Sequence, residues 1–401
     1  MKTIPGLFIL PFLLAPVASK AVEVTAESAI VMDAGSGRIL WEKDAESARF
    51  PASTTKIMTA LLLIERTRPE EVVVAPPEIK EVGESSMHLK PWEKVKSKDL
   101  LYAIMLRSAN DGSYAAAKHI AGSIPAFAEL MNQRARDLGC TRTNFQNPNG
   151  LNDPKHVTSA HDLALMAREA MKYPEFREVV GTFKFQIERS INKADRVMVS
   201  RNRLLKKDPT VEGIKTGYTR PAGYCFVGAT SREGYRVITV VLKSGNWLED
   251  TEKLMKYAFE SFEKRDKVAA GERVATVLLP NASEKVPVGA QTEAYALARR
   301  TDASPVEREI VLREGVRAPV PRGTVVGDLV MRDGVGYRHE VPVVALQDVH
   351  SLGIVNRAGQ NPSFLFVGGV LCGGAFWMRS RARRRIARHA RKTTRLPERG
   401  V

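Results

Sequence analysis

The sequence predicts an α+β domain, followed by a small all-β domain and a C-terminal membrane segment. Three observations predict this order. Strand-like runs lie at both ends of residues 22–266 and enclose a helical middle. Short alternating segments separated by Gly and Pro make up residues 267–349, and residues 364–378 carry no charge.

Residues 1–21 predict a secretory signal peptide. Lys2 precedes an apolar run over residues 7–14, and small residues follow as far as Ala21. A buried N-terminal helix is the alternative, but three prolines in this stretch oppose it, because proline breaks a helix interior. We therefore leave this segment out of the fold and expect the rest of the chain to be exported.

The sequence pattern of the larger domain, residues 22–266, predicts one antiparallel sheet with helices packed on it. A β-hairpin begins at Ala29, around the turn Ala34-Gly-Ser-Gly. Apolar periodicity predicts helices over 57–64, 97–121, 159–173 and 251–262, and strands over 224–230 and 236–242. Because strands occur at both ends of this domain, its N-terminal and C-terminal strands are expected to be neighbours.

The C-terminal end predicts a membrane anchor. Residues 350–363 are a polar linker, and the fifteen uncharged residues 364–378 follow. As a helix they extend about 22 Å, short of the roughly 30 Å hydrocarbon core, but flanking arginines and bilayer thinning permit a span. An interfacial helix is the alternative, although the segment lacks a polar stripe. Since residues 379–401 are basic, the positive-inside tendency places this tail in the cytoplasm and residues 22–363 outside it.

The net charge of +16 does not indicate a nucleic-acid partner. The tail from Arg379 onward holds ten Lys or Arg residues and one Glu, so it supplies more than half of this charge. The rest of the chain is only mildly basic, and no nucleic acid is expected to bind it.

Cysteine and histidine usage excludes two further classes of protein. Three cysteines are too few for a disulfide scaffold, and only Cys140 and Cys225 are candidates to pair, with free buried thiols as the alternative. The seven histidines show no metal-ligand spacing. We expect His88, His119, His156 and His161 to be surface or structural residues, with no metal and no organic cofactor.

Ser53 is the candidate nucleophile, although its motif is not unique. Ser-x-x-Lys occurs three times, at Ser53/Lys56, Ser190/Lys193 and Ser261/Lys264. Only Ser53 lies at the start of an apolar helix, where Ser and Lys three apart share a face and backbone N–H groups can bind an oxyanion. A serine at such a place is more often a helix cap, so the motif needs support from elsewhere in the chain.

That support comes from two further motifs in order: Ser108-Ala109-Asn110, and Lys215-Thr216-Gly217 at the entry to a strand. Such a trio marks serine β-lactamases and penicillin-binding proteins, in which Asp stands where this chain has Ala109. Together with longer stretches, residues 25–350 resemble the low-molecular-mass penicillin-binding proteins that are D-alanyl-D-alanine carboxypeptidases. These stretches are Phe50-Pro-Ala-Ser-Thr-Thr-Lys-Ile-Met-Thr-Ala, Leu106-Arg-Ser-Ala-Asn-Asp, Asn147-Pro-Asn-Gly-Leu and Val211-Glu-Gly-Ile-Lys-Thr-Gly-Tyr-Thr.

The resemblance implies a penicillin-binding, β-lactamase-like fold, a peptidoglycan stem peptide ending in D-Ala-D-Ala as substrate and β-lactam antibiotics as inhibitors. Ser53 would be acylated, with Lys56 as its base, and Ser108 would relay a proton to the leaving D-alanine. Asn110 would hold the substrate amide, Lys215 and Thr216 would face its carboxylate, and Gly217 would allow close approach. The backbone N–H groups of Ser53 and Tyr218 would form the oxyanion hole.

One departure from the family concerns substrate recognition. Relatives usually have an arginine before the last helix that grips the terminal carboxylate, and Trp247 occupies that place here; Arg220 is the expected substitute.

Three other functions stay open at this point. They are a β-lactamase, a D,D-endopeptidase acting on cross-links, and a non-catalytic, membrane-tethered protein that binds the cell wall.

Overall fold

The computed structural model describes residues 22–352 except residue 335, and these residues form two compact units. The first unit runs to Glu263 and also includes Arg299–Thr301. The second contains Lys264–Ala298 and continues from Asp302. The domain boundary expected between residues 266 and 267 lies slightly later in the chain than this division.

The first unit is built on a five-stranded antiparallel sheet in the order β2-β1-β9-β8-β7. The strands are β1 (Ser28–Asp33), β2 (Ile39–Lys43), β7 (Val211–Thr219), β8 (Gly223–Arg232) and β9 (Tyr235–Ser244). β1 pairs with β9, with Ser28 opposite Leu242, so the prediction that the N-terminal and C-terminal strands are neighbours is confirmed. β7 is an edge strand of this sheet.

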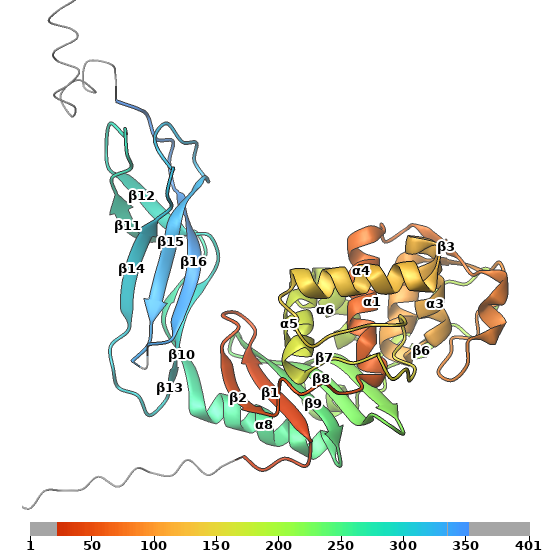
Figure 1. The fold of residues 1–401 in the computed structure, drawn as a ribbon. Helices are drawn as coiled ribbons and strands as arrows, with labels where there is room; N and C mark the ends of the chain where they lie inside the picture. The colour runs from red at the N-terminus through yellow and green to blue at the C-terminus, as the bar shows by residue number, and fades with distance from the viewer. Residues whose placement is uncertain (1–21, 335, 353–401) are drawn as a thin grey trace, which may run out of the picture. The chain divides into compact units, whose positions relative to one another are not determined.

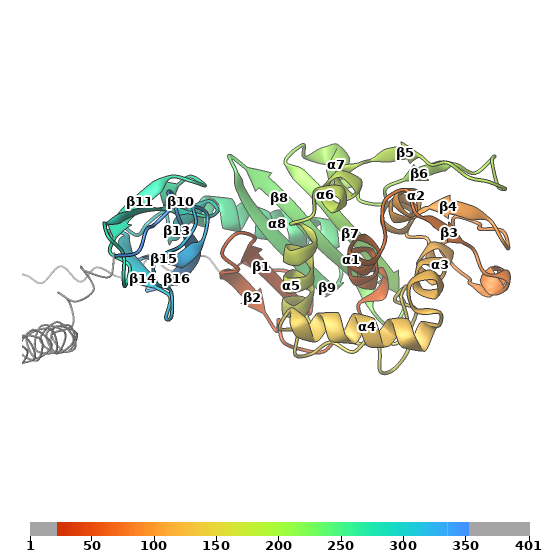
Figure 2. The same ribbon diagram turned by 90° about the horizontal axis from the view of Figure 1, so that it is seen from above.

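Helices cover both faces of this sheet (Figures 1 and 2). α8 (Trp247–Ser261) packs against β9 and β8 on one face, and α5 (Ala160–Ala170) packs on the other. α1 (Lys56–Arg66) is buried on every side from Lys56 to Leu63, as expected for a central helix.

The remaining elements of this unit are short or peripheral. The helices are α2 (Ser97–Tyr102), α3 (Asn110–Ala121), α4 (Ile124–Asp137), α6 (Pro174–Gly181) and α7 (Leu204–Lys207), with 3₁₀ turns η1 (Ala52–Thr55) and η2 (Pro77–Glu81) and the π turn η3 (Ala103–Arg107). Two small hairpins pair β3 (Val72–Val74) with β4 (Lys94–Lys96) and β5 (Lys184–Gln186) with β6 (Val197–Val199).

The helix predicted over residues 97–121 is interrupted at Ser108. α2 and η3 end there, Ser108 adopts φ 65° and ψ 36°, and α3 begins at Asn110. Left-handed backbone is unfavourable for a residue other than glycine, so tertiary contacts must maintain it. The interruption brings both Ser108 and Asn110 to the wall of one cavity.

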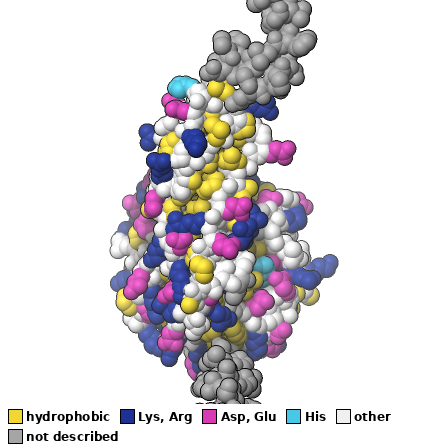
Figure 3. Space-filling model, turned by 90° about the vertical axis from the view of Figure 1, so that its left-hand side faces the viewer, with side chains coloured by type: hydrophobic (Ala, Val, Ile, Leu, Met, Phe, Trp, Pro, Cys, Tyr) yellow, Lys and Arg dark blue, Asp and Glu magenta, His cyan; other side chains and the backbone are white. Residues whose placement is uncertain are grey.

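The second unit is all-β, as predicted. Its five-stranded sheet has the order β11-β12-β16-β15-β14, and β10 pairs with β13. The strands are β10 (Phe262–Val268), β11 (Arg273–Val277), β12 (Val286–Ala290), β13 (Ala294–Arg299), β14 (Glu307–Leu312), β15 (Val325–Arg332) and β16 (Arg338–Ala345). Alternating residues such as Val286, Val288, Leu329 and Val343 form its core. Figure 3 shows hydrophobic side chains gathered over one face of this unit.

Several sequence-based expectations fall outside the described residues. These are the signal peptide (1–21), most of the linker, the membrane segment (364–378) and the basic tail (379–401). Within the described part, no helix has both the length and the apolar character needed to cross a membrane. Cys140 and Cys225 are buried free thiols, so the pairing considered for them is not formed.

Candidate active site

Ser53 lies in η1, immediately before the central helix α1. Lys56 is the first residue of α1, and its Nζ lies 3.1 Å from Ser53 Oγ. Nζ also donates to Asn110 Oδ1 at 2.7 Å and to the Asn149 carbonyl oxygen at 2.6 Å. A neutral amine has two N–H groups and one lone pair. Because these two acceptors engage both N–H groups, the lone pair of neutral Lys56 faces the Ser53 hydroxyl.

The environment of Lys56 favours that neutral form. The side chain is fully buried. The pKa of Lys56 lies well below its ordinary value, mainly because of burial and secondly because of the positive charges of Lys215 and Arg201. A lysine held in this way can accept a proton near neutral pH.

The Ser108-Ala109-Asn110 segment contributes Ser108 and Asn110 to the wall of the cavity. Ser108 is 1% exposed and lines the cavity, and its Oγ has no hydrogen-bond partner among the described residues. Asn110 Oδ1 accepts from Lys56, and its Nδ2 donates to the Gly83 carbonyl at 3.0 Å. Asn110 therefore orients the lysine, and one N–H of its amide remains to contact a substrate.

The Lys215-Thr216-Gly217 segment belongs to the edge strand β7. A Cβ on Gly217 would lie 3.0 Å from Ser53 N and 3.2 Å from the Pro51 carbonyl oxygen, so only glycine lets the strand run this close to the nucleophile. Lys215 is buried, and its Nζ donates to the Thr216 carbonyl. Burial lowers the pKa of Lys215 to about 7, with a further contribution from Arg201.

Two residues that sequence reasoning did not assign hold the Ser53 turn in place. Gly150 has φ +83°, and a Cβ there would lie 1.8 Å from the Ala52 carbonyl oxygen. His156 is buried; its Nδ1 accepts from Gln146 N, so its Nε2–H donates to Thr55 Oγ1 at 2.9 Å. His156 is thus structural, as expected, but it lies beside the nucleophile, and nothing in the sequence pattern indicates this.

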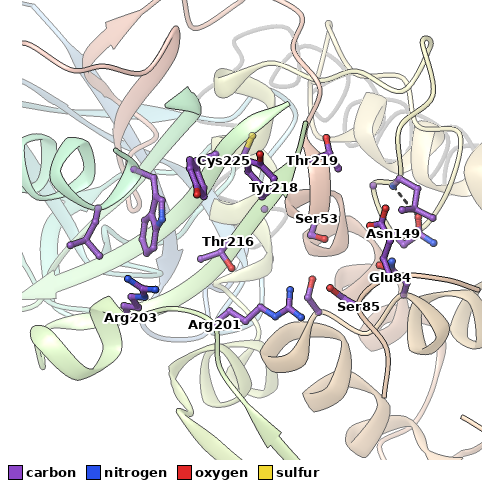
Figure 4. A pocket seen from close by; sticks show the side chains of 18 of the residues that line it. Ser53, Glu84, Ser85, Asn149, Arg201, Arg203, Thr216, Tyr218, Thr219 and Cys225 are labelled. Carbon is purple, nitrogen blue, oxygen red and sulfur yellow. Dashed lines mark hydrogen bonds between the residues drawn. The ribbon is translucent and has the colours of Figure 1, made fainter. Parts of the chain in front are cut away.

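These elements enclose a cavity of about 540 Å³ in the first unit (Figure 4). Of the expected site residues, Ser53, Ser108, Asn110, Thr216, Gly217 and Tyr218 line it, whereas Lys56 and Lys215 are buried. The structure thus brings the three motifs together. The other Ser-x-x-Lys sequences, which start at Ser190 and Ser261, are not part of this lining.

Arginine placement in the cavity differs from the expectation. Arg220 does not line the cavity, whereas Arg201 and Arg203 do. Figure 4 shows Arg201 extending toward Ser53 and Arg203 farther from it, with Glu84 at the opposite end. Trp247 also lines the cavity, and its ring lies 4.6 Å from that of Phe226, measured between centroids. Arg220, the residue expected to replace the missing arginine, is thus absent from the cavity lining, to which Arg201 and Arg203 contribute instead.

One group of potential metal ligands occurs among the described residues. Glu46, His161 and Asp162 place ligand atoms within 4.8 Å of one another. The Asp162 oxygens already accept from Thr141 N, Arg142 N and Thr143 Oγ1, and His161 Nδ1 pairs with Glu46. This group lies outside the cavity lining, and internal bonds account for it.

Comparison with known proteins agrees with this geometry. Residues 15–246 match the family described as D-alanyl-D-alanine carboxypeptidase, and residues 262–351 match that described as penicillin-binding protein 5, C-terminal domain. The chain is 31% identical over 340 residues to D-alanyl-D-alanine carboxypeptidase DacF of Bacillus subtilis, covering 82% of this chain and 87% of the relative.

Solved structures resemble both units. Penicillin-binding protein 5 of Haemophilus influenzae is 28% identical with a TM-score of 0.67, covering 82% of this chain and 98% of that one. A peptidoglycan synthesis regulatory factor, PBP3, of Streptococcus pneumoniae is 27% identical with a TM-score of 0.71, covering 82% and 100%.

Proposed function

This chain belongs to the D-alanyl-D-alanine carboxypeptidase family, and we propose that Ser53 is the residue through which it acts. The protein is a serine peptidase that removes the terminal D-alanine of peptidoglycan stem peptides, and covalent penicillin binding is consistent with its family. The observation that carries the assignment to Ser53 is the buried Lys56 amine, 3.1 Å from Ser53 Oγ.

Lys56 activates the nucleophile. Its lone pair takes the proton of the Ser53 hydroxyl as Oγ attacks the carbonyl carbon of the penultimate D-alanine. The bond from this carbon to the leaving nitrogen then breaks, and an ester to Ser53 remains. Water hydrolyses this ester and regenerates the serine, so no metal or organic cofactor is needed.

The walls of the cavity supply the other roles. The Ser108 hydroxyl relays to the departing amine the proton that Lys56 took from Ser53: it gives up its own proton and is reprotonated from Lys56, and its oxygen has no other hydrogen-bond partner among the described residues. Asn110 holds the substrate amide with its remaining N–H. The terminal carboxylate lies against Thr216 and Lys215, and Arg201 takes the place that we had expected for Arg220.

The edge of β7 binds the acyl part of the substrate. Since β7 ends the sheet, its outer backbone groups can pair with an extended peptide. The N–H groups of Ser53 and Tyr218 form the oxyanion hole, and the closeness of Gly217 to Ser53 N supports this arrangement. Such donors contribute about 3 kcal/mol each to transition-state stabilisation.

Fluorescent penicillin and a D-Ala-D-Ala pentapeptide test this assignment on the full chain. Ser53→Ala should abolish both covalent labelling and release of D-alanine. Ser190→Ala is the matched control, because Ser190 begins the same Ser-x-x-Lys spacing outside the cavity, and both activities should persist. Labelling that survives in Ser53→Ala would overturn the proposal.

Two other activities of the same residues give distinct results. A β-lactamase would hydrolyse nitrocefin continuously, whereas a carboxypeptidase should be acylated once by nitrocefin and then release the hydrolysed product slowly. A D,D-endopeptidase would cleave cross-linked dimers as fast as pentapeptides. A non-catalytic wall-binding protein would not be labelled by penicillin at all.

We also propose that the enzyme is exported and tethered to the cytoplasmic membrane with its first unit on the outer face. The leader-like residues 1–21, the uncharged residues 364–378 and the basic residues that follow support this. Membrane pelleting tests it: the full chain should sediment with membranes, and a chain ending at residue 352 should not. A full chain found in the supernatant would contradict the tether.

A further inference from the structure

The cavity continues around the edge of the sheet, beyond Ser53. Thr216 and Tyr218 of β7 pair with Phe226 and Tyr224 of β8, and cross-strand partners project from the same face of a sheet. Because the Phe226 ring contacts Trp247 of α8, this is the α8 face. Gly217, between the two, faces Ser53 on the opposite side. We call the part of the cavity on the α8 face the Trp247 end.

The Trp247 end combines apolar and cationic groups. Tyr224, Trp247 and Leu248 line it, and Tyr224 is 47% exposed, so its ring is available to a ligand. Arg203 lines the same cavity and is exposed, and its guanidinium has no hydrogen bond or ion pair to a described residue. Several other arginines of this unit are paired; Arg236, for example, bonds both oxygens of Glu212.

Charge fixes the direction in which a substrate lies. Arg201 lies near Ser53 on the Thr216 side, whereas Glu84 lies at the other end of the cavity (Figure 4). The terminal carboxylate therefore belongs on the Thr216 side, and the acyl arm extends toward Glu84. Groups that lie beyond the carboxylate site, such as Arg203, face the side chain of the leaving residue, because Arg203 lies farther from Ser53 than Arg201 does (Figure 4).

We infer that Arg203 and Trp247 form a subsite for the side chain of the leaving residue, which rests on the function proposed above. This subsite accepts D-residues larger than alanine and favours those with a side-chain carboxylate. The indole ring packs against the methylene groups of the side chain, and the guanidinium binds its carboxylate. The reaction is the same hydrolysis, with a bulkier, anionic amine as the leaving group.

Two peptides with the same acyl arm and different last residues, D-Ala-D-Glu and D-Ala-D-Gln, test this inference. The two ends differ in charge but hardly in shape. The full-length enzyme should cleave the D-Glu peptide with a kcat/KM about 1.5- to fivefold higher, as expected for one solvent-exposed ion pair. Arg203→Gln should reduce this ratio to about one, whereas Trp247→Ala should lower kcat/KM for both peptides by a similar factor.

Controls separate this subsite from the catalytic site. Arg220→Gln removes a nearby arginine outside the cavity and should keep the D-Glu preference. Penicillin labelling of Arg203→Gln reports that its serine site is folded. Equal cleavage of both peptides by the wild type, cleavage of neither while D-alanine is still released, or a preference that survives in Arg203→Gln would overturn the inference. Absence of both D-alanine release and labelling in the wild type would instead refute the proposed function.

Discussion

Gly150 lies so close to Ala52 that a Cβ on residue 150 would be 1.8 Å from the Ala52 carbonyl oxygen. The same Cβ would lie 2.8 Å from Thr55 Oγ1. The loop containing Gly150 therefore packs directly on the turn that carries Ser53. Its neighbour Asn149 also accepts a hydrogen bond from Lys56 through its carbonyl oxygen, so one loop positions both the nucleophile and its base.

Gly150→Ala should slow acylation by roughly 10²-fold, because a displacement of about 1 Å at the reacting atoms has that effect. Gly139→Ala is the matched control: Gly139 has φ +83° as well, but a Cβ there meets nothing within 4 Å. Both variants carry the backbone penalty of left-handed alanine, about 1 kcal/mol. The rate of labelling by fluorescent penicillin measures the difference, and equal rates in the two variants would contradict the packing argument.

Arg201 should set the pH range of the reaction. Its charge lowers the pKa of both Lys56 and Lys215, so Arg201→Gln should raise both values. Acylation needs neutral Lys56, so the acidic limb of the pH–rate profile should move to higher pH. On that limb the rate at a fixed pH should fall about tenfold for each unit by which the pKa of Lys56 rises. Carboxylate binding needs protonated Lys215; it should weaken above about pH 7 in the wild type and persist to higher pH in the variant.

Profiles of kcat/KM between pH 5 and 10 measure both limbs. Arg220→Gln is the control for a general loss of positive charge, because Arg220 is exposed and does not line the cavity. If the acidic and basic limbs of the kcat/KM profile lie at the same pH in Arg201→Gln and in the wild type, Arg201 does not set these pKa values and acts only by contact with the substrate.

The sequence was sufficient for the α+β domain, the all-β domain and the three motifs, because each depends on local pattern, whereas the predicted membrane segment lies outside the described residues. Alternating and helical periodicity predicted the sheet and the buried α1. The interruption at Ser108 was not predictable, since the apolar periodicity continues across it and tertiary contacts maintain its left-handed backbone. Arg201 was missed for a related reason: a loop arginine carries no periodic signal, and its effect on Lys56 arises only when distant segments meet.

His156 should make the protein sensitive to acid. Burial lowers the pKa of His156 to about 4, below the value of about 6.5 expected in the unfolded chain. The unfolded state therefore binds a proton first as the pH falls. The stability that neutral His156 confers is complete above pH 6.5 and is lost progressively toward pH 4, by about 2 kcal/mol between pH 7 and pH 5.

His156→Gln tests this, because glutamine can still accept from Gln146 N and donate to Thr55 but cannot titrate. Urea unfolding at pH 7 and pH 5 gives the free energy of unfolding of both proteins. The variant should lose about 2 kcal/mol less than the wild type over this interval. An equal loss in both proteins would assign the acid sensitivity to other groups.

Arg189 and Glu93 form an ion pair with both side chains 0% exposed. The guanidinium makes two parallel bonds of 2.8 Å to the carboxylate and also donates to the Met87 and His88 carbonyls. It therefore secures the chain just after Glu84 and Ser85, which line the cavity. Loss of one partner leaves a buried charge without compensation, which destabilises a protein by about 3–5 kcal/mol.

Glu93→Gln should therefore lower the melting temperature of the full chain by roughly 6–20 °C, at about 2–4 °C per kcal/mol for a domain of this size and about 3–5 kcal/mol of lost stability. The matched control is Glu260→Gln, which removes an exposed partner of Lys256 and should shift melting by less than about 2 °C. Because Ser85 also accepts from Asn110 N at 2.7 Å through its carbonyl, loosening this loop should raise KM for the pentapeptide as well. Equal melting temperatures for the two variants would show that water or a neighbouring group compensates Arg189, and that the loop does not depend on the pair.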